Sequence, residues 1–192
     1  MAIANIINDT TLSGNSGTGA FVGSTSPSLV TSTIGVASAT SMFFTSTAGI
    51  IGTTTNDSAD AGSVGEYIFS TIPFSSSVSL TTDTAADVTS ISLTAGDWDV
   101  FGNVTLTGDS TTTVDFSRSW ISSTSTTLPD ASLYSKIYGR GATFSVLSSF
   151  GGLAPALRFS LSGTTTIYLS TQATFAISTA DACGGIYAMR VR

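Results

Sequence analysis

The sequence predicts an all-β chain in which an extended, β-rich stem precedes an antiparallel β-sandwich of jelly-roll type. Ser and Thr, 33 of each, make up 66 of the 192 residues, and Thr favours strands, as Val, Ile and Phe do. The residues that usually fill helices form no helical blocks, and the chain has only one Lys, one Glu and one Gln. From Glu66 onward, short runs of alternating apolar and polar residues follow one another with turn residues between them, which is typical of sandwiches and jelly rolls.

Residues 1–62 are expected to form the stem. They are small and polar, with isolated apolar clusters at Phe21-Val22, Leu29-Val30, Met42–Phe44 and Ile50-Ile51. These clusters lie too far apart to make a core in one copy, so the segment is either a linker or, in three copies around an axis, a stem. A linker rarely contains Phe, Ile and Met, so we favour the stem. The Asn56–Gly65 stretch has the composition of a hinge, and residues 63–192 are the expected sandwich domain.

The expected strands follow in order after the hinge. They are Ser77–Thr81, Val88–Leu93, Trp98–Leu106, Thr113–Ile121, Leu157–Leu161, Ile167–Ile177 and Ile186–Arg192. Gly102 predicts a bulge or a close backbone approach in the third run, and Val114, Phe116 and Trp120 are expected on one face of the fourth. The Thr127–Pro155 region is the least regular and rich in Gly, so we expect long loops there, at one end of the sandwich.

Charge is scarce and unevenly divided. Charged residues make up 9% of the chain, against about 25% in a typical soluble domain, which favours an oligomer or fibre with covered surfaces. All basic residues lie after position 117: Arg118, Lys136, Arg140, Arg158, Arg190 and Arg192. These basic residues could pair with the acids that precede position 117, within or between subunits, or they could form a basic face that binds a polyanion. We favour the pairing. The net charge of −6 makes nucleic acid an unsuitable partner.

The residue types exclude the commonest catalytic groups. The chain has no His, which removes Ser-His-Asp triads, Cys-His pairs and most zinc sites. Asp97 and Asp99 flank Trp98, and on a strand their side chains point to the same side. They could bind calcium or act as an acid–base pair. Alternatively, they are the polar side of an amphipathic strand whose Trp98 faces inward. We favour the amphipathic strand, and expect no enzyme, metal or cofactor. Cys183 is expected to be a buried thiol.

Neither a secretory signal nor a membrane span is visible. Residues 1–9 lack a basic start and a continuous apolar core, and no run of 18 apolar residues occurs. We therefore expect folding in the cytoplasm of the producing cell, without membrane insertion.

Three passages together carry a resemblance. They are Thr10–Gly35, Val88–Val100, and the ending formed by Tyr168–Thr179 and Gly184–Arg192. These resemble tail-fibre and tail-associated proteins of bacteriophages and prophages, whose C-terminal domain type also occurs on collagen-like bacterial adhesins. The resemblance implies a homotrimer located in the virion, with other virion structural proteins and a host-surface glycan or protein as partners. The chain would be a fibre or spike for host attachment.

Two other functions compete with this one. A bacterial adhesin for acidic glycans lacks support from a signal peptide or a Gly-X-Y repeat, and a polysaccharide depolymerase would need a carboxylate cleft. The candidate receptor-binding residues are Tyr134, Lys136, Tyr138 and Arg140, in the expected loops. A wider basic patch would add Arg118 and Arg158. Such cations bind carboxylates, and the aromatic rings stack on sugars. The alternative is that the basic residues pair with acids of a neighbouring subunit.

Overall fold

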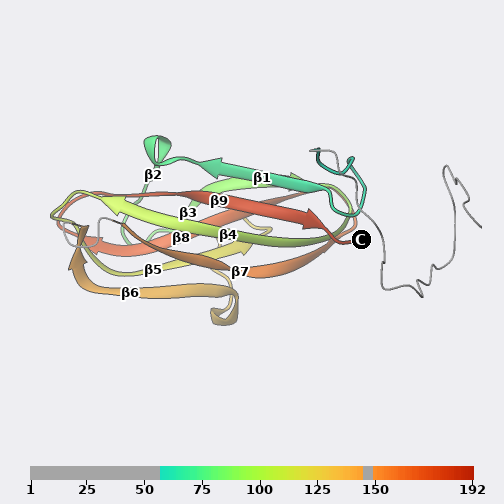
Figure 1. Cartoon of the computed structure of the whole chain (residues 1–192). Coiled ribbons are helices and arrows are strands. Elements are labelled where there is room, and N and C mark those ends of the chain that lie inside the picture. Colours follow the sequence, from blue (N-terminus) through green and yellow to red (C-terminus); the bar gives the residue numbers. More distant parts are fainter. Residues whose placement is uncertain (1–56, 145–148) are drawn as a thin grey trace, which may run out of the picture. The chain divides into compact units, whose positions relative to one another are not determined.

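A computed structural model describes residues 57–144 and 149–192. The described chain is an antiparallel two-sheet sandwich of jelly-roll type, which confirms the predicted fold class (Figure 1). Its strands are β1 (Tyr67–Ile72), β2 (Val78–Ser79), β3 (Ala86–Leu93), β4 (Gly96–Gly108), β5 (Thr113–Ser122), β6 (Tyr134–Thr143), β7 (Phe150–Leu161), β8 (Thr165–Ala176) and β9 (Ala180–Arg190). The expected stem lies outside the described residues except for 57–62.

The two sheets exchange strands along the chain. Sheet A has the order β1-β9-β4-β7, with β2 also paired to β9, and sheet B has the order β3-β8-β5-β6. After β3 the chain crosses from one sheet to the other at each connection except that between β5 and β6. The β5–β6 connection contains a short 3-10 helix, Ala131–Leu133, and precedes their antiparallel pairing. This strand exchange makes both sheets depend on residues far apart in sequence.

Alternation along the strands builds the core between the sheets. Trp98, Val100, Val104 and Leu106 of β4 are at most 2% exposed, as the predicted inward face requires. Ile167, Leu169 and Ala173 of β8 meet them from sheet B and belong to the same buried cluster. The expectations that Trp98 faces the core and that Cys183 is buried are confirmed. So is the bulge at Gly102, where the β4–β7 register shifts between Val100 and Gly102.

The expectation of long loops over Thr127–Pro155 is wrong. Most of this region is strand, because β6 occupies Tyr134–Thr143 and β7 begins at Phe150. Three of its four glycines, Gly139, Gly151 and Gly152, allow close approach of neighbouring strands, whereas Gly141 has a positive φ. A Cβ at Gly139 would lie 2.4 Å from the carbonyl oxygen of Val114, and one at Gly152 would lie 2.3 Å from the Ile137 side chain. Strand β1 was also not predicted.

The expected common face of Val114, Phe116 and Trp120 is wrong as well. A register shift between Val114 and Phe116, seen in both pairings of β5, reverses the alternation. Val114 and Ile121 lie in the core cluster, whereas Phe116 and Trp120 do not. The strand predicted to end at Ile177 ends one residue earlier, and Ile177 is 76% exposed with φ of 82°.

Candidate functional site

The Asp97–Trp98–Asp99 strand is structural. Asp97 is 6% exposed and accepts hydrogen bonds from Nε of Arg192 at 2.7 Å and from the Ser160 hydroxyl. The Ser160 hydrogen bond is the main cause that lowers the pKa of Asp97, with help from Arg192 and Arg158 against desolvation. In the described residues, no group of three or more His, Cys, Asp or Glu side chains could hold a metal ion. Trp98 faces the core and Asp99 is exposed, as the amphipathic-strand interpretation requires, whereas Asp97 is buried and paired with Arg158 and Arg192.

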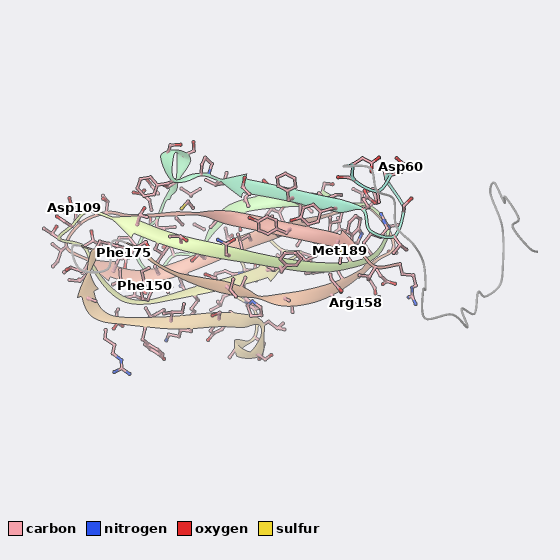
Figure 2. The ribbon with its side chains drawn as sticks, viewed as in Figure 1. Asp60, Asp109, Phe150, Arg158, Phe175 and Met189 are labelled. Carbon is pink, nitrogen blue, oxygen red and sulfur yellow. The ribbon has the colours of Figure 1, made fainter. Side chains whose placement is uncertain are left out.

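Three of the late basic residues pair with early acids. Arg158 Nη2 lies 3.6 Å from Asp97, beside the Arg192 contact, near the end of the sandwich where the chain ends (Figure 2). Arg190 Nε donates to Glu66 at 2.8 Å, and Arg190 is 5% exposed. The expected pairing of the two halves is confirmed for these pairs, which all lie within one chain.

A different arrangement occupies the outer face of sheet B. Strands β5 and β6 place Phe116 opposite Tyr138 and Arg118 opposite Lys136. The Arg118 guanidinium carbon lies 4.9 Å from the Phe116 ring centre and 5.2 Å from that of Tyr134. Lys136 Nζ lies 3.8 Å from the Phe116 ring centre and 4.5 Å from that of Tyr138. We call these five residues the cation–aromatic face.

Among the described residues, the cations of this face have no acidic partner. Within the described residues, neither Arg118 nor Lys136 has a carboxylate within 4.0 Å, since the ion pairs there involve Arg158, Arg190 and Arg192. Arg118 Nη1 donates one hydrogen bond, to Gln172 at 3.4 Å. Its Nε is buried and has no protein acceptor. The arrangement can therefore attract an anion and offer it guanidinium donors.

The structure brings together part of the predicted site. Tyr134, Lys136 and Tyr138 lie together, but on strand β6 rather than on loops. Arg140 lies further along β6 with φ of 52°, before Gly141 at 76°, and among the described residues it takes no part in the cation–ring contacts of the other three. Arg158 is separate, because it lies on β7 of sheet A. The sequence did not reveal Phe116, whose ring both cations share, because alternation predicted it on one face with Val114.

The outer face of sheet A carries a row of exposed rings that the sequence did not reveal. Tyr67 and Phe69 of β1, Tyr187 of β9 and Phe101 of β4 stack in turn, with ring centres 5.6 to 6.5 Å apart. Tyr67, Phe69 and Phe101 are 42%, 59% and 43% exposed. We call these four residues the aromatic row.

Apolar neighbours extend this row. Met189 is 44% exposed beside Tyr187 on β9, and Leu153 of β7 is 73% exposed. Figure 2 shows Met189 toward the end of the sheet where the chain ends. A groove of about 500 Å³ adjoins the row and is lined by Phe101, Tyr187, Leu153, Pro155 and Ser135 among others. Such a surface is unusual on a free monomer.

Among the described residues, no helix has the length and apolar character needed to cross a membrane. The chain matches no protein-family model and no curated protein. Among solved structures it is similar to the VP2 subviral particle of infectious bursal disease virus, with a TM-score of 0.38 and 14% identity. That match covers 74% of this chain and 37% of the VP2 chain.

Proposed function

We propose that the chain is a structural protein of a virus particle, a fibre or spike that assembles as a homotrimer and contacts the host surface. The resemblance of three sequence passages to phage tail fibres supports this role. The observation that carries it is the aromatic row, an exposed apolar face on a chain with 9% charged residues. The sandwich itself serves as a rigid carrier for contacts on its faces.

The aromatic row has the composition of a subunit interface. Tyr, Phe and Met are enriched in interface cores, where charged residues are depleted. Phe69, Phe101 and Met189 lie on three adjacent strands, β1, β4 and β9, of one sheet. We assign this face to a second copy of the chain, because an oligomer buries these rings on every subunit at once.

The experiment measures the mass of the full chain in solution by light scattering. We expect a trimer, and we expect the double variant Phe69→Ser, Phe101→Ser to dissociate at concentrations where the parent does not. Ile177→Ser is the matched control, since Ile177 is 76% exposed but follows β8 of sheet B. A parent chain that is monomeric at micromolar concentration would contradict assembly through this face.

A second experiment tests the location. An antibody raised against the chain should label particles released from the source cells, and labelling of the cell surface alone would favour the bacterial adhesin instead. For host contact the sequence predicts Tyr134, Lys136, Tyr138 and Arg140, and we propose the three of these β6 residues that take part in the cation–ring contacts, Tyr134, Lys136 and Tyr138. Purified chain should reduce adsorption of the particles to host cells, and Tyr134→Ala with Tyr138→Ala should remove this competition.

A further inference from the structure

We infer that the cation–aromatic face binds the carboxylate group of an acidic sugar. This inference deepens the proposed function, on which it rests for its setting, by naming the class of host ligand. It also extends the set of contact residues, because Phe116 and Arg118 enter.

The two cations of this face carry positive charge that no carboxylate of the described residues compensates. Arg118 and Lys136 are register partners and both lie within 5 Å of the Phe116 ring centre. Two like charges held side by side repel each other, and a bound anion relieves that repulsion. Acids outnumber bases by twelve to six in the chain, and Arg158, Arg190 and Arg192 each have one as a partner. The unpaired state of this face is therefore not due to a shortage of carboxylates.

The second argument is the donor geometry of Arg118. A guanidinium carries five N–H donors in a planar fork that matches a carboxylate. Arg118 uses one of them, in a 3.4 Å bond to Gln172. The rings of Phe116 and Tyr134 flank the group at 4.9 and 5.2 Å, so it loses little freedom when a ligand binds.

The third argument favours a sugar over a bare anion or an acidic peptide. Tyr134 and Tyr138 border the two cations, and Tyr138 is 59% exposed. Their rings offer apolar faces on which a pyranose can lie, with a hydroxyl at the edge. The Gln172 amide, opposite Arg118 on β8, donates to the Asp83 carbonyl at 2.7 Å and accepts from Arg118, so it helps to hold the guanidinium in place. A face built along two paired strands, β5 and β6, suits a polymer that lies along the strands.

The experiment measures binding of the full chain to immobilised polymers. The acidic sugars are polygalacturonate, hyaluronan and polysialic acid, with dextran as the neutral sugar and polyglutamate as a carboxylate polymer without sugar. We expect binding to at least one acidic sugar, weaker at high salt, and none to dextran. Arg118→Gln and Lys136→Gln should each weaken it at least about tenfold, the loss expected for a charge-assisted hydrogen bond. Arg140→Gln, which makes the same charge change on the same strand, should leave it nearly unchanged.

Several results would overturn the inference. These are no binding to any of the three acidic sugars, equal binding to polyglutamate, or a loss in Arg140→Gln as large as in Arg118→Gln. Melting temperatures check folding, and if Arg118→Gln does not fold, Arg118→Lys keeps the charge but loses the fork and should still bind more weakly. A chain found on particles that binds no acidic sugar refutes only this inference. A chain that binds the sugar but is absent from particles refutes only the proposed function.

Discussion

Arg190 on the last strand donates from Nε to Oε2 of Glu66 across 2.8 Å, and so joins β9 to the segment that enters β1. The guanidinium also donates to the Ala95 carbonyl at 2.8 Å and to the Thr94 hydroxyl at 2.6 Å. It lies 4.3 Å from the Trp98 ring centre. This buried cation is fully partnered, in contrast to Arg118, so its role is to hold the end of the sandwich together.

The first prediction concerns this ion pair. Glu66→Gln should lower the free energy of unfolding by about 3 kcal/mol, because a charge left buried without its partner costs about that much. Urea denaturation at pH 7 measures the loss. Asp60→Asn is the control, since Asp60 is exposed and the ion pairs among the described residues involve Asp97 and Glu66 instead. A Glu66→Gln variant as stable as the control would show that the pair is not needed.

The second prediction concerns pH. The backbone hydrogen bond from Gly62 chiefly lowers the pKa of Glu66 below 4.5, and Arg190 contributes against desolvation. A pKa lowered by folding adds stability that is complete above the unfolded value and is lost as the pH falls through the folded value. We therefore expect stability to fall below about pH 4.5. The fall should be smaller in Glu66→Gln, as measured by denaturation at a series of pH values; parallel curves for parent and variant would contradict this assignment.

The third prediction concerns Gly96, which precedes Asp97 at the start of β4. Its φ is 135°, and a Cβ there would lie 2.0 Å from Nη1 of Arg190. Gly96→Ala should cost at least about 2 kcal/mol, through backbone strain and displacement of Arg190. Gly163→Ala is the matched control, because a Cβ at that turn would meet nothing within 4 Å. Equal melting temperatures for the two variants would show that Gly96 is not required by backbone strain or by the position of Arg190.

The fourth prediction concerns the Asp-Trp-Asp strand. Trp98 is fully buried, so Trp98→Ala should cost about 3–5 kcal/mol, as for other buried aromatic side chains. Asp99→Asn should be mild, because Asp99 is exposed. A melting temperature that falls on adding chelator would instead indicate a metal site at the two carboxylates.

The sequence predicted the strands whose apolar and polar residues alternate. It did not predict the features that depend on strand register or on glycines that let two strands approach closely. The runs of β3, β4, β5, β8 and β9 were visible because one side of each meets the core. Strand β6 was not predicted, since it is an edge strand in which Gly139 accommodates the Val114 carbonyl, and its polar residues and glycines resemble those of a loop.

The site depended on a single bulge. Simple alternation placed Phe116 with Val114, and the register shift between them moves Phe116 outward, beneath both cations. The residue types around Val114 and Phe116 do not indicate a bulge, so the cation–aromatic face could not be predicted from the sequence. Likewise the aromatic row joins strands that pair only in the fold, such as β1 with β9.

The last prediction concerns Asp87, which fastens the loop after β5 to sheet B. Its carboxylate accepts hydrogen bonds from the Ser125 hydroxyl at 2.6 Å, the Thr126 N–H at 3.0 Å and the Ser170 hydroxyl at 2.6 Å. Ser170 is the register partner of Trp120, a residue that is fully buried although it lies outside the core cluster. We therefore expect the fastened loop to shield Trp120 from water.

Asp87→Ala should release this loop and expose Trp120, at a cost of about 1–3 kcal/mol for the lost hydrogen bonds. The chain has two Trp residues, so a Trp98→Phe background leaves Trp120 as the only one. Acrylamide should then quench its fluorescence more strongly in Asp87→Ala than in the parent. Asp181→Ala is the control, because Asp181 accepts a hydrogen bond from Ser79 at 2.7 Å on the other sheet. Equal quenching in both variants would mean that sheet B buries Trp120 without the loop, and the Asp87 hydrogen bonds would then order the loop alone.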